Sequence, residues 1–143
     1  MKRDFKIYHL GYVFKDVDTQ IESIKSLDYR IRFHTFEQHD IPCVFRGKDS
    51  KVSLKIAVSQ LLSLDIELIQ PLEGESPYKE FLERGKEGLH HLAISVDNIT
   101  PYIEAYQKKG TKILFLIQVG PLDVVYLDTE KELGIVIEFI AQK

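Results

Sequence analysis

The feature that most constrains this sequence is a short pattern that occurs twice. Residues 9–17 read HLGYVFKDV and residues 91–99 read HLAISVDNI. Each copy begins with His-Leu, continues with a small residue and strand-forming apolar residues, and ends with an acid or amide before a branched aliphatic residue. A second echo, 71 residues apart, is Ile-Glu-Leu-Ile at 66–69 and Ile-Glu-Phe-Ile at 137–140. The chain is therefore expected to contain two similar halves, each supplying one histidine and one glutamate.

Hydrophobic periodicity predicts the same order of elements in both halves. In the first half, the pattern predicts strands at 5–14, 29–34, 52–58 and 64–70 and a helix that Asp16 caps. In the second half, it predicts strands at 89–96, 111–118, 124–127 and 135–140 and a helix that begins at Asn98 and ends at Gly110. Each half is thus expected to be a βαβββ module.

The two modules are expected to span about 5–72 and 88–143 and to pack as one α+β domain over residues 1–143. A short helix through Arg84 is expected between them, and no low-complexity linker separates them. The first half has 11 more residues than the second between its second and last strands. Segment 37–50 is the expected place for this insertion, as an added strand at 41–46 or as a loop over the site.

Composition narrows the classes of function. A chain of 143 residues with 44% apolar residues can bury a core, while a net charge of −3 provides no basic surface for nucleic acid. No apolar run is long enough to cross a membrane and the N-terminus has no apolar signal region. Cys43 is the only cysteine, which fits a reducing compartment. We expect a cytoplasmic protein with no nucleic-acid or membrane partner.

The repeated residues predict a metal site. His9 and Glu67 belong to the first and last strands of one half, and His91 and Glu138 occupy the matching places in the other. If the two sheets combine around a pseudo-two-fold axis, the four side chains converge on one point. Two imidazoles and two carboxylates suit a divalent Co, Ni, Mn, Fe or Zn ion, and burying such carboxylates without a cation is costly. His90 is expected to face away from this point.

Several segments resemble one known family. The segments are His9-Leu-Gly-Tyr-Val, Ile66-Glu-Leu-Ile-Gln-Pro, Ser76-Pro, Phe81-Leu, Gly88-Leu-His-His-Leu-Ala-Ile-Ser-Val-Asp and Gly134-Ile-Val-Ile-Glu. They resemble the vicinal oxygen chelate superfamily, which includes glyoxalases, bleomycin resistance proteins and dioxygenases, and within it the methylmalonyl-CoA epimerases. The resemblance implies paired βαβββ modules that form a curved mixed sheet around one divalent metal. It also implies a homodimer.

The resemblance implies which residues bind the metal and what reaction follows. His9, Glu67, His91 and Glu138 match the family's four ligand positions, and some members have glutamine at the position of Glu67. The chemistry shared by the epimerases and glyoxalase I is removal of a proton next to a metal-bound carbonyl, with Glu138 as the expected base. The small-molecule substrate would be an acyl-CoA for an isomerase, or a thiol hemithioacetal for a lactoylglutathione lyase. A third alternative is a non-enzymatic binding or resistance protein.

Two further expectations concern the substrate. Some epimerases carry a second catalytic glutamate, but the two alignments of this chain place Pro42 or Ile56 at that position, so neither supplies a carboxylate. A CoA substrate would favour cations for its phosphates. The candidate cations are Arg46, Lys48, Lys51, Lys108 and Lys109, most of which are more simply explained as solvated surface charges.

Overall fold

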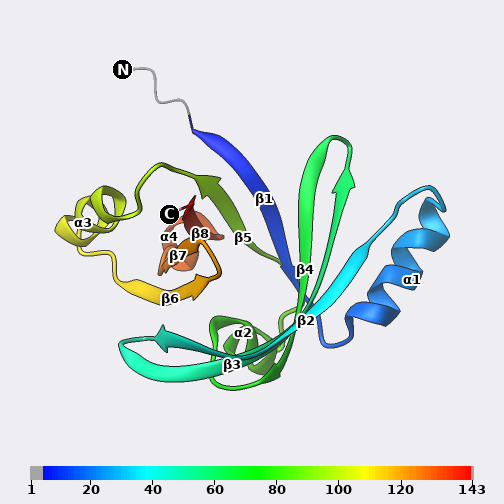
Figure 1. Ribbon diagram of the computed structural model, residues 1–143, viewed down its shortest axis with the longest axis horizontal. Coiled ribbons are helices and arrows are strands. Elements are labelled where there is room, and N and C mark those ends of the chain that lie inside the picture. Colours follow the sequence, from blue (N-terminus) through cyan, green and yellow to red (C-terminus); the bar gives the residue numbers. More distant parts are fainter. Residues whose placement is uncertain (1–4, 143) are drawn as a thin grey trace.

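The computed structural model describes residues 5–142 of the chain. Eight strands and four helices make up these residues (Figure 1). In chain order they are β1 (Lys6–Val13), α1 (Val17–Leu27), β2 (His34–Phe45), β3 (Lys48–Leu61), β4 (Leu64–Glu73), α2 (Pro77–Glu83), β5 (Gly88–Ser95), α3 (Thr100–Lys108), β6 (Ile113–Val119), β7 (Leu122–Leu127), α4 (Glu130–Leu133) and β8 (Val136–Gln142).

The strands form one mixed sheet that closes into a barrel in the order β1-β4-β3-β2-β6-β7-β8-β5. Within each half, the first and last strands are parallel, β1 to β4 and β5 to β8. The halves join at two seams. One is the antiparallel pair of β1 and β5, with seven paired positions from Lys6 to Val13. The other is short and pairs Cys43–Phe45 of β2 with residues 115–117 of β6. The α+β fold and curved mixed sheet predicted from the sequence are confirmed.

Alternation along the strands divides the apolar residues between the barrel interior and two outer layers. In β8, Val136 and Ile140 pack inside the barrel, whereas Ile137 and Phe139 pack outside it with residues of α3. In β4, Ile69 faces inward and Leu68 packs outward with residues of α1. In Figure 1, α1 and α3 lie on the outer sides of the two halves. A residue between two outward side chains, such as Glu138, therefore faces the interior.

Local signals in the sequence explain most element boundaries. The Asp16 carboxylate accepts a hydrogen bond from the backbone N–H of Thr19, as expected of an N-cap, and Ser76 does the same for Lys79 at the start of α2. Asn98 lies one residue further from α3 than predicted and accepts from Thr100 N–H. The short helix α4 was not predicted; its four residues are too few for a periodic pattern.

The strand predicted at 29–34 is wrong, because only His34 belongs to a strand. Asp28 holds a turn there: its backbone carbonyl accepts from Ile31 N–H and its carboxylate accepts from Arg30 N–H and from the Arg30 guanidinium. These local hydrogen bonds compete with strand pairing. The alternation of apolar and basic residues in this segment imitates a strand without forming one.

The insertion in the first half is neither an added strand nor a loop over the site. It lengthens the β2–β3 hairpin, whose strands have 12 and 14 residues against 7 and 6 in the matching β6–β7 hairpin. A bulge interrupts the β2–β3 pairing between Gln38 and Ile41, and Asp40 has a left-handed backbone with φ of 54°. None of the described helices is long and apolar enough to cross a membrane.

Candidate metal centre

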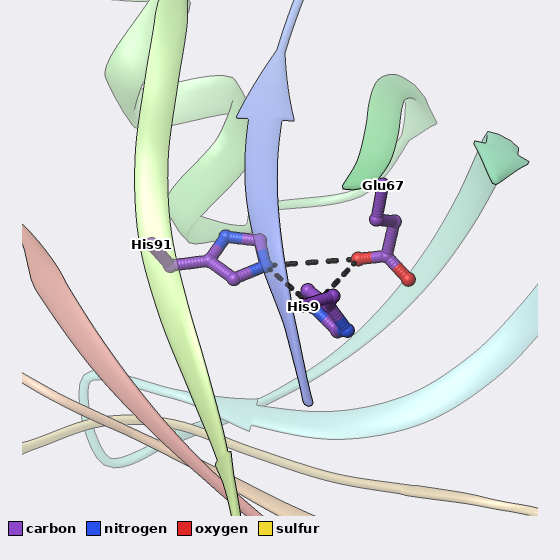
Figure 2. A group of neighbouring side chains, drawn as sticks. All are labelled: His9, Glu67 and His91. Carbon is purple, nitrogen blue, oxygen red and sulfur yellow. Dashed lines mark hydrogen bonds and ion pairs between the residues drawn. The ribbon is translucent and has the colours of Figure 1, made fainter. Parts of the chain in front are cut away.

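The structure brings the four repeated residues to one place inside the barrel. The Nε2 atoms of His9 and His91 are 3.2 Å apart. His9 comes from β1 and His91 from β5, the two antiparallel strands that join the halves. Figure 2 shows both imidazoles and the Glu67 carboxylate of β4 pointing toward one another. The ligand atoms of these three residues all lie within 4.8 Å of one another.

Glu138 completes the cluster from β8. Its Oε2 atom is 3.3 Å from Nε2 of His9 and 3.3 Å from Nε2 of His91. The Glu67 Oε1 atom is 3.4 Å from His9 Nε2 and 3.6 Å from His91 Nε2. Atoms that bind one ion with bonds of about 2.1 Å at right angles lie roughly 3 Å apart. The observed separations are close to this spacing.

Burial makes the negative charge of the Glu138 carboxylate costly. The Glu138 side chain is only 4% exposed and its Oε2 atom has no hydrogen-bond partner among the described residues, despite the two nearby imidazoles. A buried carboxylate oxygen without a partner is costly unless a cation neutralises it. This orphaned oxygen is the observation that best fits a bound divalent ion. The set of two imidazoles and two carboxylates suits the borderline and hard first-row ions.

The two histidines are perturbed in opposite directions. Burial lowers the pKa of His9, but the adjacent Glu138 carboxylate and the charge of Glu67 outweigh it and raise that pKa to about 9. Burial dominates at His91 and lowers its pKa to about 4, against the charge of Glu138. Burial also raises the pKa of Glu67. Strongly perturbed pKa values of neighbouring groups cluster at functional sites.

His90 supports His91 from behind. The two Nδ1 atoms are 3.0 Å apart, and the His90 ring lies against Phe81 of α2, with ring centroids 4.8 Å apart. Burial lowers the pKa of His90 well below its usual value, so its ring is neutral and its Nδ1 can accept a hydrogen bond from the Nδ1–H of His91. That bond leaves Nε2 of His91 as the free nitrogen that faces the cluster. His90 therefore faces away from the site, as predicted.

Two tyrosines next to the cluster were missed in the sequence. The hydroxyls of Tyr78 and Tyr126 hydrogen-bond to each other at 2.7 Å, and the Tyr126 hydroxyl lies 3.4 Å from His91 Nε2. Burial raises the pKa of both hydroxyls well above the usual value, so both stay protonated. The two residues come from α2 and β7, and no periodic signal connects them. Only the tertiary fold brings them together.

A cavity of about 540 Å³ opens on the cluster. His9, Glu67 and Glu138 line it, together with Tyr78 and Tyr126. This volume is within the usual range for a small-molecule site. The two carboxylates and the His9 imidazole thus lie on the wall of a chamber inside the barrel, and His91 lies buried behind them.

The family assignment agrees with this arrangement. The sequence model of the Glyoxalase/Bleomycin resistance protein/Dioxygenase superfamily matches residues 8–121. The chain belongs to this superfamily. The match includes His9, Glu67 and His91, and it extends over most of the chain. Members of the superfamily typically bind a metal.

Two relatives match the sequence of this chain over shorter stretches. The uncharacterized protein YqjC of Bacillus subtilis is 31% identical over 61 residues, which are 43% of this chain and 44% of YqjC. The mitochondrial methylmalonyl-CoA epimerase of Mus musculus is 40% identical over 50 residues, 34% of this chain and 28% of the mouse protein. The chain therefore spans less than half the length of the curated relatives that it matches.

Solved structures share the fold over nearly the whole chain. A hypothetical protein from Bacillus halodurans superposes with a TM-score of 0.72 at 22% identity and covers 99% of this chain and 96% of its own. Methylmalonyl-CoA epimerase from Mycobacterium tuberculosis has a TM-score of 0.67 at 16% identity, and the superposition covers 100% of this chain and 93% of the epimerase. The epimerase of Streptomyces coelicolor, in complex with 2-nitronate-propionyl-CoA, has a TM-score of 0.67 at 18% identity. That superposition covers 96% of this chain and 94% of the epimerase. At these identities the likeness concerns the fold.

The remaining sequence candidates lie away from the cavity. Arg46 forms ion pairs with Glu80 and Asp128, at 2.7 and 3.3 Å. The other four candidate cations are exposed, namely Lys48, Lys51, Lys108 and Lys109. None of the five candidates lines the cavity. Of the two positions aligned with a second catalytic acid, Ile56 lines the cavity and Pro42 does not.

Proposed function

We propose that this chain is a divalent-metal-dependent enzyme that removes a proton from the carbon next to a carbonyl group. The observation that carries the proposal is the buried Glu138 oxygen, which has no hydrogen-bond partner within residues 5–142 and lies 3.3 Å from two imidazole nitrogens in a ligand-sized cavity. His9, Glu67, His91 and Glu138 would hold the ion. A bound divalent cation would supply Lewis-acid polarisation of the substrate carbonyl, which makes the neighbouring C–H more acidic.

The protein side chains would accept the proton, position the metal ligands and line the cavity. Glu138 lies on the cavity wall and is the proposed base, accepting the proton at its carboxylate. His90 fixes the ring of His91 through the bond between their Nδ1 atoms. Tyr78 and Tyr126 close the cavity behind His91 and provide protonated hydroxyls at its surface. The apolar walls exclude water from the base.

Two reactions use this chemistry. The resemblance to methylmalonyl-CoA epimerases favours an isomerase that acts on an acyl-CoA. A specific observation favours the second candidate, a glyoxalase I-like lyase that acts on a thiol hemithioacetal. An epimerase needs a second group that returns the proton on the opposite face, yet the acids among the described lining residues are only Asp65, Glu67 and Glu138. A lyase returns the proton with the same base. The four converging ligands argue against a purely sequestering protein.

Two assays on metal-analysed protein separate these reactions. Proton exchange at C2 of methylmalonyl-CoA reports the isomerase, and loss of the methylglyoxal–thiol hemithioacetal reports the lyase. Activity in the first assay alone establishes an epimerase, and activity in the second alone establishes a lyase. Protein that binds no divalent metal would contradict the proposal for both.

Replacement of the base provides the sharpest test of mechanism. We expect Glu138→Gln to lower turnover by about 10²- to 10⁴-fold, the usual contribution of a general base, while the protein still binds some metal. Glu67→Gln is the matched control, because it makes the same change on the same cluster at a position where related proteins tolerate glutamine. It should keep turnover within about tenfold. Near wild-type turnover of Glu138→Gln would refute the assignment.

A further inference from the structure

The cavity beside the candidate metal centre has mostly apolar walls apart from the metal-facing side. Strands β2, β3, β6, β7 and β8 contribute these walls. Their side chains include Phe36, Leu54, Ile56, Ile117, Val124 and Ile140. Most of these residues are less than 10% exposed, and they belong to the same core cluster as Tyr78. A ligand held by its oxygens at the metal-facing side therefore extends over hydrocarbon.

Charge inside the cavity points the same way. No lysine or arginine is among the described residues that line it. The polar lining residues beyond the cluster include Gln38 and an exposed pair near the mouth, where the Gln60 amide donates to the Asp65 carboxylate at 3.1 Å. The Asp65 charge also acts on His9. A second anionic group inside this cavity would thus meet apolar walls, a few uncharged polar side chains or a carboxylate, with no cationic side chain among the described lining residues to neutralise it.

We propose that the natural substrate carries, beside the oxygens that face the metal centre, an uncharged apolar substituent that fills this chamber and is larger than a methyl group. The inference rests on the proposed function, which supplies the metal-facing end of the substrate. It adds the chemical class of the other end. Any phosphate-bearing carrier, such as the nucleotide part of CoA, lies outside the described cavity walls.

A homologous series of chelators tests the proposal. Alkyl hydroxamates share one two-oxygen head and differ only in the tail, from acetohydroxamate to hexanohydroxamate. They are titrated into the Co²⁺-loaded protein, and binding is followed by the visible absorption of the cobalt. Each buried methylene should tighten binding about fourfold until the chamber is full. A tail of equal length that ends in a carboxylate should bind at least tenfold more weakly than its methyl-ended counterpart.

Two variants on β6 test whether the ligand tail binds inside the cavity. Val119 is half-buried and lines the cavity next to the β6–β7 turn, whereas the neighbouring Gln118 is exposed and does not line it. Val119→Lys should weaken binding of the longest alkyl hydroxamate by at least tenfold and tighten binding of the carboxylate-ended one. Gln118→Lys adds the same charge on the other face of the strand and should change neither. Thermal unfolding checks that both variants are folded.

The outcomes separate the two proposals. Affinities within twofold across the alkyl series, or a carboxylate tail that binds as tightly as a methyl tail, would overturn the apolar substituent. A metal-independent measurement uses the neutral fluorophore N-phenyl-1-naphthylamine, displaced from the metal-free protein by alkyl amides of increasing length. If the amides show the length dependence but no hydroxamate perturbs the cobalt, the metal-based function fails and the apolar chamber stands. If the hydroxamates perturb the cobalt but the amides show no length dependence, only this inference fails.

Discussion

At the scale of single residues, the two copies of the repeated pattern face each other across one strand pair. In the β1–β5 ladder, His9 is opposite Ala93 and His91 is opposite Gly11. Each histidine thus lies across from the small residue that follows the other histidine by two positions. A Cβ atom added at Gly11 would lie 1.9 Å from both Cε1 and Nε2 of His91. The glycine at position 11 is therefore a steric requirement of the opposite imidazole, that of His91.

This requirement makes Gly11→Ala a test of the site that does not touch a ligand. The variant must displace the His91 ring, and we expect metal affinity to fall by at least tenfold, measured by competition with a chromogenic chelator. Gly85→Ala is the control, because an added Cβ there meets nothing within 4 Å; its φ of +77° gives this variant a backbone strain that Gly11→Ala does not have. It should lose about 1 kcal/mol of stability and keep the wild-type metal affinity. Equal metal affinity in both variants would contradict the steric explanation.

The sequence predicted much of the site at this scale, for a physical reason. The internal repeat pairs positions that symmetry places together, so the convergence of His9, Glu67, His91 and Glu138 could be expected without coordinates. The repeat contains no information on contacts that only one half makes. Tyr78 lies on α2, which has no equivalent between β8 and the end of the chain, and its hydroxyl partner Tyr126 belongs to the other half. Such contacts depend on the packing of α2 against the barrel.

At the scale of elements, the helices α2 and α4 are tied together by charged residues at the outer end of the barrel. Glu130 at the start of α4 accepts hydrogen bonds from Arg84 at 2.7 Å and from Lys86 at 2.7 Å. The hydrogen bond from Arg84 is the main reason that the pKa of Glu130 falls to about 2. This network lies behind His90, which lines the same surface cleft. The network therefore stabilises, from outside the barrel, the position of His90, which supports His91.

The low pKa of Glu130 predicts a pH-dependent contribution to stability. A carboxyl whose folded pKa is below its unfolded value of about 4.3 stabilises the fold fully above that value. The contribution is lost as the pH falls through about 2. Urea denaturation should show Glu130→Gln to be on the order of 1 kcal/mol less stable than wild type at pH 6, and the gap should shrink steadily below pH 4. Glu104→Gln, an exposed position on α3, should show no gap at either pH.

Element boundaries were predictable where local chemistry and burial agree. The Asp16 cap and the apolar stripe of α1 indicate the same helix, and β4 and β8 were found within a few residues. The strand predicted at 29–34 was wrong because hydrogen bonds from Arg30 to the Asp28 carboxylate outweigh an alternating pattern that has no neighbouring strand. The length of the β2–β3 hairpin was also missed. An insertion that continues two strands has the same sequence signature as an added strand.

At the scale of the whole molecule, the barrel is closed by two seams of unequal strength. The β1–β5 seam has seven paired positions and carries both histidines, whereas the β2–β6 seam has three. Local opening follows the weaker set of contacts. The barrel is thus expected to open between β2 and β6 while the candidate metal centre stays intact.

Native-state hydrogen exchange measures this difference directly. The amide of Arg46, which donates to the Leu114 carbonyl at the end of the short seam, should exchange at least tenfold faster than amides of β1 and β5 that face each other. The experiment is read by NMR on the wild-type protein at neutral pH. The amide of Phe14, bonded to the Ile69 carbonyl beside β1, is a reference within the same half. Uniform protection across both seams would show that the barrel opens only as a unit.

The short seam has one further consequence, for how copies of the chain behave when concentrated. Among the described residues, no strand pairs with the outer side of β2 from His34 to Pro42, so this stretch presents an open sheet edge. Such edges recruit strands from other molecules and seed fibrils. Here Pro42 lacks an N–H to offer, and the bulge with the left-handed Asp40 bends the strand just before it. The irregular stretch of the long hairpin therefore makes it a poor template for self-association.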